Sequence, residues 1–135
     1  MSIMPSIKMA VSPEHQELVK ALIDKLAKEG FKILEASYEG YPEPRQRGRH
    51  EPDVYAYKYE IQLEAIGEAK LCEDLDTERT KEQFKDFSSR YMPEGKSRNM
   101  PVPFYIAVPQ KCKQKAHEKL VELGLAGRAN VSLDP

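Results

Sequence analysis

The first regular pattern in the chain is an apolar stripe at helical spacing. The positions on this stripe are Leu18, Val19, Leu22, Ile23 and Leu26. Such spacing is typical of the buried face of an α-helix. Ser12-Pro13 precedes the stripe and Gly30 follows it, and these residue types favour a helix start and a helix end. The pattern therefore predicts a helix between Pro13 and Gly30.

Further along, alternation with a period of two and a short apolar run predict strands, separated by helical segments. The expected order is a strand over 31–38, a two-stranded hairpin over 50–71, a helix over 78–91 capped by Asp76 or Thr77, a strand over 102–109, a helix over 111–123 and a last edge strand over 130–133. A strand-helix-strand unit implies a parallel pair. We therefore expect one α/β domain over 1–135, with a mixed central sheet flanked by helices in the order αβββαβα(β). Residues 1–11 are expected to form a flexible N-terminal segment.

The hairpin over 50–71 carries the candidate chemistry. Because side chains alternate across a strand, its second strand has two faces. The apolar or small face comprises Ile61, Leu63, Ala65, Gly67, Ala69 and Leu71, and the other face comprises Gln62, Glu64, Ile66, Glu68 and Lys70. We expect the first of these to be the packed face. If the turn centres between Glu60 and Ile61, Asp53 lies opposite Glu68, with Lys70 alongside.

Two carboxylates directly opposite each other destabilise a sheet, so a purely structural role does not favour this arrangement. A divalent cation removes the conflict, because Mg²⁺ takes a few carboxylate oxygens together with waters and substrate phosphate. Attack of a metal-activated water on a phosphodiester is an established reaction type. Asp53, Glu68 and Lys70 therefore predict a metal-dependent phosphodiesterase in which Lys70 holds the attacking water or the phosphate. The alternative is a surface hairpin with solvated charges.

At these residues the chain resembles the PD-(D/E)XK nuclease superfamily, which has the restriction-endonuclease-like fold. Pro52-Asp53 is similar to the PD element and Glu68-Ala69-Lys70 to the ExK element, with a hairpin between them. The order of elements resembles the core of that family from Ser12 to Leu123. In size and layout the chain looks most like small Holliday-junction resolvases and RecB-like or phage-type nucleases.

The resemblance implies Mg²⁺-dependent cleavage of DNA, less often of RNA, with Mn²⁺ able to replace Mg²⁺. It implies that Asp53, Glu68 and the Ala69 carbonyl bind the metal, and that Lys70 assists catalysis. No specificity domain accompanies the motif, so either a homodimer supplies a second half-site or the protein reads DNA shape. Some members have lost catalysis, and the alternative function is a non-catalytic nuclease-fold subunit that binds nucleic acid or a protein partner.

Helices on either side of the motif supply further candidates. Many relatives carry an additional acid on the first helix, and here that residue is Glu14 or Glu17, with Glu17 preferred. A favourable interaction with the helix dipole is the alternative explanation for a glutamate at this place. The helix after the ExK strand resembles one that contacts substrate in this superfamily. Its candidates are Gln83 for positioning and Arg79, Lys81 and Lys85 for phosphate contacts, with solvated charge as the alternative.

An arginine-rich segment precedes the first hairpin strand. Arg45, Arg47 and Arg49 surround one glycine and suit a flexible arm that reaches phosphates in a groove. Solvated loop charge is again the alternative. His50 is a weaker candidate for a general base beside the metal.

Composition narrows the function classes only a little. With 21 basic and 22 acidic residues the net charge is −1, which disfavours non-specific coating of DNA but allows a local basic face. The two cysteines, Cys72 and Cys112, form no CxxC motif, so we expect unpaired thiols in a reducing compartment. No apolar run approaches the ~20 residues of a membrane span, and no signal peptide is apparent. We therefore expect a cytoplasmic protein.

Overall fold

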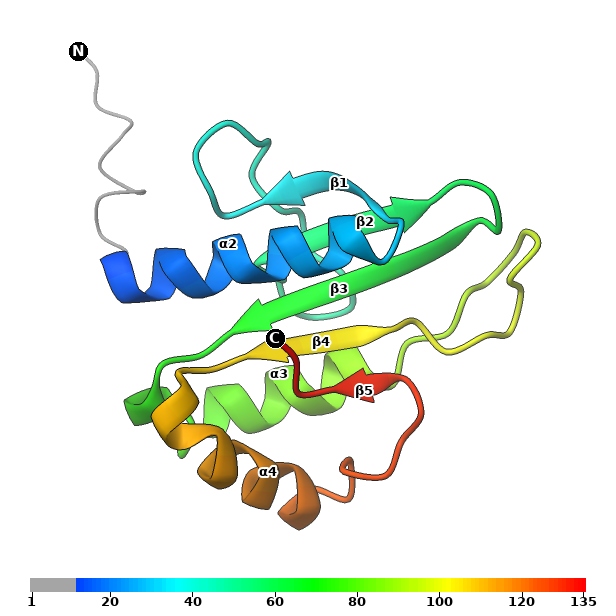
Figure 1. The fold of residues 1–135 in the computed structure, drawn as a ribbon. Helices are drawn as coiled ribbons and strands as arrows, with labels where there is room; N and C mark the ends of the chain where they lie inside the picture. Colours follow the sequence, from blue (N-terminus) through cyan, green and yellow to red (C-terminus); the bar gives the residue numbers. More distant parts are fainter. Residues whose placement is uncertain (1–11) are drawn as a thin grey trace.

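The computed structural model describes residues 12–135 (Figure 1). Its elements are α2 (Pro13–Lys28), β1 (Lys32–Ala36), β2 (Val54–Lys58), β3 (Leu63–Ala69), the 3₁₀ helix η1 (Cys72–Asp74), α3 (Glu78–Ser88), β4 (Phe104–Ala107), the 3₁₀ helix η2 (Gln110–Cys112), α4 (Lys113–Glu122) and β5 (Val131–Ser132). The expectation of a flexible segment over 1–11 lies outside the described residues. Within 12–135, no helix has both the length and the apolar character needed to cross a bilayer.

Five strands form one mixed sheet in the order β1-β2-β3-β4-β5. The first three strands form an antiparallel meander, whereas β3 pairs with β4, and β4 with β5, in parallel. A parallel pair needs a crossover connection, and α3 provides it between β3 and β4. The predicted α/β class, the mixed sheet and the order of the elements are confirmed.

The first helix, α2, covers one face of the sheet. It starts as predicted, because the Ser12 hydroxyl accepts a hydrogen bond from the backbone N–H of His15 at 3.1 Å. Its buried residues are Val19, Leu22, Ile23 and Leu26. Leu22 lies against Gly67 of β3, where an added Cβ would come within 3.2 Å of the leucine methyl. The glycine therefore lets the helix lie close to the middle of the sheet.

The second long helix, α3, covers the opposite face. The rings of Phe84 and Phe87 contact that of Phe104, with centroids 5.9 and 5.6 Å apart. Phe104 pairs with Ile66 across the β3–β4 ladder, so α3 lies over the face that carries Ile66 and Glu68. The prediction that only the other face of β3 would pack is therefore wrong. Ile66 is fully buried and Glu68 is 4% exposed, because the helix that follows β3 folds back over it.

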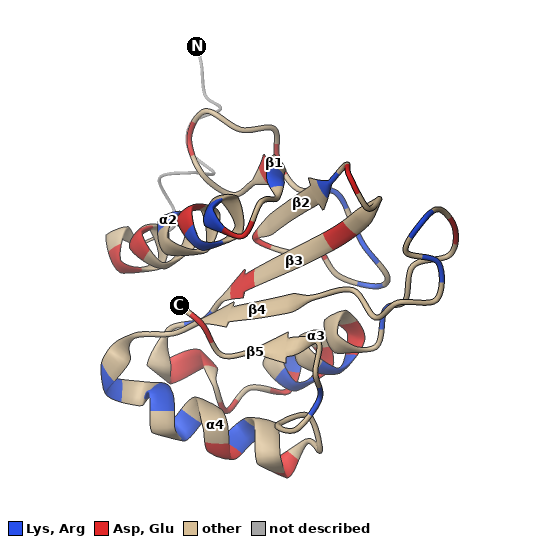
Figure 2. Ribbon diagram, turned by 45° about the vertical axis from the view of Figure 1, so that its right-hand side comes forward, with Lys and Arg blue, Asp and Glu red and all other residues tan. Residues whose placement is uncertain are grey.

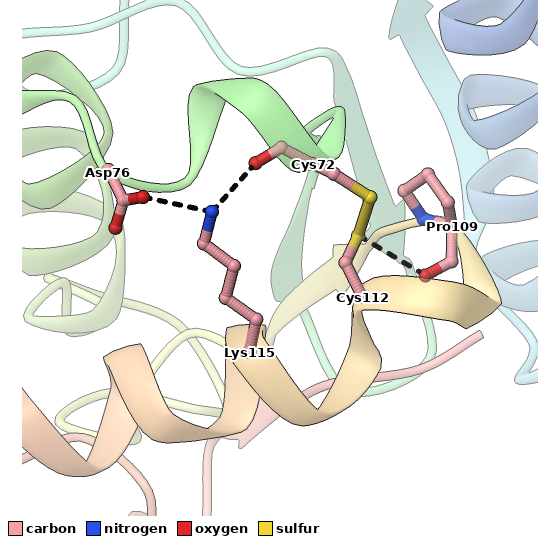
Figure 3. Close-up of a disulfide and its surroundings, with 5 residues drawn as sticks. All are labelled: Cys72, Asp76, Pro109, Cys112 and Lys115. Carbon is pink, nitrogen blue, oxygen red and sulfur yellow. Dashed lines mark hydrogen bonds and ion pairs between the residues drawn. A yellow bond between two sulfur atoms is a disulfide. The ribbon is translucent and has the colours of Figure 1, made fainter.

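The two cysteines are joined, so the prediction of unpaired thiols is also wrong. Cys72 begins η1, Cys112 ends η2, and the two form a disulfide with Cα atoms 5.8 Å apart (Figure 3). They are separated by 40 residues in the sequence. Because β3 and β4 are parallel neighbours, the chain leaves both strands at the same end of the sheet, and this brings the cysteines together.

Candidate functional site

Asp53 and Glu68 meet where β2 begins and β3 ends. Val54 pairs with Gly67 in the antiparallel ladder, so the next position outward in the same register sets Asp53 opposite Glu68. The backbone N–H of Asp53 donates to the Gly67 carbonyl at 3.0 Å, which ties the residue before β2 to the end of β3. The register inferred from a turn centred between residues 60 and 61 is confirmed. Figure 2 marks acidic positions towards both ends of β3, and Glu68 is the one at the end next to Asp53.

Each carboxylate of the pair is held by the neighbouring strand. The Asp53 N–H also donates to Glu68 Oε1 at 3.1 Å, and the Ala69 N–H donates to Asp53 Oδ2 at 2.9 Å. Charge-assisted hydrogen bonds of this kind fix both the position and the orientation of a carboxylate. The backbone of the two strand ends therefore holds the acids facing one another.

Burial makes Glu68 an unusual acid. Removal from water raises its pKa well above the ordinary value, and the nearby charge of Asp53 raises it further. Lys70 opposes both effects, since its Nζ lies 3.4 Å from Glu68 Oε2 and its side chain is only 12% exposed. The net shift of the Glu68 pKa is upward, so the nearby Lys70 does not offset the effect of burial on Glu68.

His15 of α2 is the helix residue that reaches this pair, and the sequence did not single it out. Its Nε2 lies 3.5 Å from Asp53 Oδ2. The hydrogen bond to Asp53 raises the pKa of His15; burial lowers it, while the Asp53 charge and the Ala69 backbone raise it further and Lys70 lowers it, with a net rise. The other ring nitrogen, Nδ1, is buried and has no hydrogen-bond partner among the described residues.

The predicted helix acids lie elsewhere. Glu14 and Glu17 are both exposed, and Glu17 makes no ion pair with any described residue. Glu17 precedes Lys20 and Asp24, which pair with each other on the solvent side of α2. Positions 15, 19, 22 and 26 instead share the face that turns towards the sheet. The helix residue beside Asp53 is therefore His15 and not Glu17.

Gln83 is the α3 candidate that faces the sheet. It is 3% exposed, and its Oε1 has no hydrogen-bond partner among the described residues. It shares the buried side of α3 with Phe84 and Phe87, which lies over the face of β3 that carries Glu68. Of the basic candidates on this helix, Arg79 and Lys85 are exposed, whereas Lys81 is half-buried and lies 3.3 Å from Glu78.

The arginine segment is not a free arm. Glu35, which is 5% exposed, accepts hydrogen bonds from the backbone N–H and the Nε of Arg45, both at 2.9 Å, and from Arg47 Nη2 at 3.2 Å. The guanidinium of Arg47 also stacks on the Tyr55 ring at 3.8 Å and its side chain is only 12% exposed. Arg45 remains 78% exposed. Arg47 therefore has a structural position, and Arg45 and Arg49 are the exposed arginines of the segment.

A β-bulge explains why Glu35 reaches these arginines. The β1–β2 register shifts between Ile33 and Glu35, so that Ile33 pairs with Ala56 but Glu35 pairs with Tyr55. A bulge turns the following side chain to the other face of the sheet. Burial raises the pKa of Glu35, but the Arg45 and Arg47 hydrogen bonds and charges outweigh burial, and the net shift is downward.

The end of the arginine segment is tied to α3. Asp86 accepts a hydrogen bond from the Arg49 N–H at 2.9 Å, and its Oδ2 lies 3.0 Å from His50 Nδ1. Gly48 stands so close to Asp86 that an added Cβ would lie 2.6 Å from its carboxylate. The His50 ring also meets the edge of Phe87. His50 therefore helps to hold the loop against α3. It lies three residues before Asp53 in the sequence.

The donors at the acid pair suit a hard divalent cation. Asp53, Glu68 and the Ala69 carbonyl offer oxygen atoms, which are the ligands that Mg²⁺ prefers. Within residues 12–135 no group of three or more His, Cys, Asp or Glu side chains is gathered as a metal cage. Mg²⁺ in proteins keeps several waters and adds substrate oxygens, so Asp53, Glu68 and the Ala69 carbonyl could hold it only together with such ligands. Burial and the charge of Asp53 raise the pKa of Glu68, and a bound cation would oppose both effects.

No family model matches the chain, and no curated protein or solved structure is significantly similar to it. The assignment of chemistry therefore rests on the geometry of the residues described above.

Proposed function

We propose that this chain is a divalent-metal-dependent nuclease of the PD-(D/E)XK type that hydrolyses DNA phosphodiester bonds. The observation that carries the proposal is the pair formed by Asp53 and Glu68, held face to face by the backbone at one end of the sheet, with Lys70 3.4 Å from Glu68. Two facing acids cost stability when they serve structure alone. A divalent cation is the ligand that offsets this cost.

The residues take distinct roles in this proposal. Asp53, Glu68 and the Ala69 carbonyl would hold Mg²⁺ or Mn²⁺, which when bound supplies an activated water and stabilises negative charge on the phosphate. The ammonium of Lys70 is a donor only, so it cannot ligate the metal and would hold the attacking water or a phosphate oxygen. His15 is a positioning residue, because it contacts Asp53 from α2 and orients that carboxylate.

A second candidate function is a non-catalytic nuclease-fold subunit that binds nucleic acid or a protein. The observation that favours it is the ion pair between Lys70 and Glu68, whose side chains are 12% and 5% exposed. In that arrangement the two residues satisfy each other, and no turnover is required to explain their presence. The two functions differ in whether phosphodiester bonds are broken.

The test combines a substrate survey with one substitution. Purified protein is incubated with branched, single-stranded and duplex DNA, and with RNA, in the presence of Mg²⁺, Mn²⁺ or EDTA. Lys70→Met keeps the length of the side chain but removes the charge. We expect single-turnover cleavage to fall by at least ~100-fold, the low end of what general acid–base or electrostatic assistance contributes.

Metal binding provides the matched control. Calorimetric titration with Mn²⁺ should show a site that survives in Lys70→Met and is lost in Asp53→Ala and Glu68→Ala. Equal cleavage by wild type and Lys70→Met would remove the proposed role of Lys70. A wild type that binds DNA tightly and never cleaves it would establish the non-catalytic alternative.

A further inference from the structure

The disulfide lies directly beside the candidate site. Cys72 follows Lys70 by two residues, and Cys112 follows β4, the parallel neighbour of β3. The last backbone hydrogen bond between these strand ends runs from the Lys70 N–H to the Ala107 carbonyl at 3.0 Å. The disulfide is the next connection beyond it. It therefore clamps the end of β3 that carries Glu68 and Lys70 to the start of α4.

The other connections at this end of the sheet are weaker. Lys115 Nζ lies 3.4 Å from the Cys72 carbonyl and 2.9 Å from Asp76 Oδ2 (Figure 3). Lys119 Nζ lies 2.9 Å from the other oxygen of Asp76. The Asp76 side chain is 59% exposed, and ion pairs at that exposure are screened and contribute little. The covalent bond is therefore a stronger tie between the strand end and α4 than either of these ion pairs.

The two sulfur atoms are not equivalent. Cys112 is 6% exposed and occupies the N-cap position of α4, whereas Cys72 is half-buried. A dithiol reductant would therefore attack Sγ of Cys72, and the S–S bond would break with Cys112 leaving as a thiolate. The helix N-terminus at which Cys112 lies stabilises such a leaving group. Closure of the reductant to its own disulfide then releases Cys72, so two electrons and two protons pass to the cysteines.

The reduced form also has a contact in place. Cys112 Sγ lies 3.4 Å from the Pro109 carbonyl. In the disulfide this sulfur has no proton, but the reduced thiol can donate to that oxygen. Reduction thus leaves the buried sulfur with a hydrogen-bond partner while the two sulfur atoms move apart.

We propose that the Cys72–Cys112 disulfide is a redox-sensitive lock that orders the segment Glu68–Lys70, so that reduction by a dithiol loosens the candidate site. The loosening is a property of the fold, whereas its effect on cleavage rests on the proposed nuclease function. Since the chain has only these two cysteines, a thiol reductant acts on no other disulfide within it.

The first measurement reports on the fold alone. Hydrogen exchange of the Lys70 amide is compared in oxidised and reduced wild-type protein, with mass spectrometry confirming the gain of two hydrogens. The Ile66 amide, which donates to the Pro103 carbonyl at 2.9 Å, is the internal control on the same strand. We expect exchange at Lys70 to accelerate at least about tenfold on reduction and exchange at Ile66 to change much less. Unchanged exchange at Lys70 in fully reduced protein would overturn the proposal.

The second measurement tests the consequence for catalysis. Single-turnover cleavage with Mg²⁺ should fall at least about tenfold on reduction and recover on reoxidation, because small displacements of catalytic groups are costly. The variant with Cys72→Ser and Cys112→Ser should match the reduced wild type with and without dithiol. Cleavage that is equally fast in both redox forms would overturn control of the site. If neither form cleaves, the nuclease proposal fails, and the exchange at Lys70 still decides whether the lock exists.

Discussion

Asp53 and Glu68 each accept a hydrogen bond from the other's strand, at 2.9 Å from the Ala69 N–H and at 3.1 Å from the Asp53 N–H. Asp53 cannot turn away without taking this partner from the Ala69 N–H, and an unpaired amide is costly, whereas the Asp53 N–H donates to the Gly67 carbonyl as well as to Glu68. The fold therefore keeps two acids in proximity against their mutual repulsion. Several measurable properties depend on that arrangement.

The stability of the metal-free protein should fall as the pH rises. Glu68 has a pKa above its ordinary value of 4.5 in the folded state, so the native state binds the proton more tightly and loses stability as the pH climbs through that raised pKa. His15, with a pKa above 6.5, acts in the same direction, because its contribution is complete below that value and is lost above the folded-state pKa. Urea unfolding in EDTA between about pH 5 and about pH 8 measures the slope.

The matched variant for this pH effect is Glu68→Gln. It removes the group whose pKa is raised, so we expect a flatter dependence of the free energy of unfolding on pH between about pH 5 and about pH 8. Added Mn²⁺ should stabilise the wild type and not the variant, as required by preferential binding to the native state. A slope that is unchanged in Glu68→Gln would show that this carboxyl does not control the pH dependence.

Replacement of His15 should weaken the site without unfolding the protein. His15→Ala removes the contact with Asp53 Oδ2, and we expect Mn²⁺ affinity or cleavage to fall by about 10–100-fold, as for other residues that orient a ligand. Glu17→Ala is the control, because its side chain is exposed on the far side of the same helix. Equal effects of the two substitutions would contradict a positioning role for His15.

The arginines of the segment before β2 should separate into two classes. Arg47→Gln removes a buried partner of Glu35 and a cation over Tyr55, so the free energy of unfolding should fall by about 2–4 kcal/mol. Arg45→Gln should cost less than about 1 kcal/mol, since its side chain is 78% exposed.

The exposed arginines, which matter least for stability, should matter most for DNA binding. Arg45→Gln combined with Arg49→Gln should weaken DNA binding and flatten its dependence on salt, because exposed arginines neutralise phosphates and release counterions. Fluorescence anisotropy at several salt concentrations measures this slope. An identical slope in the double variant would show that these exposed charges face only solvent.

Gly48 should be essential for the loop that precedes β2. Its φ of +71° already disfavours a side chain, and Gly48→Ala would place a Cβ 2.6 Å from Asp86, which is fixed by the Arg49 N–H and His50. We expect thermal unfolding to show a loss of about 2–4 kcal/mol. Gly40→Ala is the control, since its φ is +96° with nothing within 4 Å, and should cost only about 1–2 kcal/mol. Similar losses would remove the steric role of Asp86.

The facing acids could be predicted because their positions depend on local rules. In a hairpin the turn fixes the register, and alternation then decides which side chains are neighbours. The helix α2 could likewise be predicted from its N-cap residue and its apolar stripe. The same stripe contained the signal for His15, which lies four and seven positions before the buried Val19 and Leu22. Glu17 was preferred over Glu14 for its place at the edge of the apolar stripe, but its side chain lies on the polar side of the helix.

Other features depend on contacts that no local pattern specifies. The disulfide requires that β3 and β4 pair in parallel and in one register, so that Cys72 and Cys112 leave the sheet together. The pairing of Glu35 with Arg47 requires a bulge in β1 for which the residues give no turn signal. The burial of Glu68 requires α3 to fold over one particular face of the sheet. These are consequences of tertiary packing.

The short turn at Tyr59–Gln62 also influences the order in which the molecule folds. Hairpins of this kind form within microseconds, whereas β3 and β4 can pair only after the chain that contains α3 has closed its longer loop. We therefore expect Asp53 and Glu68 to come together before the core that buries Glu68 is complete. If the hairpin is formed in the folding transition state, we expect relief of this repulsion by protonation or by a cation to accelerate folding as well as to stabilise the native protein.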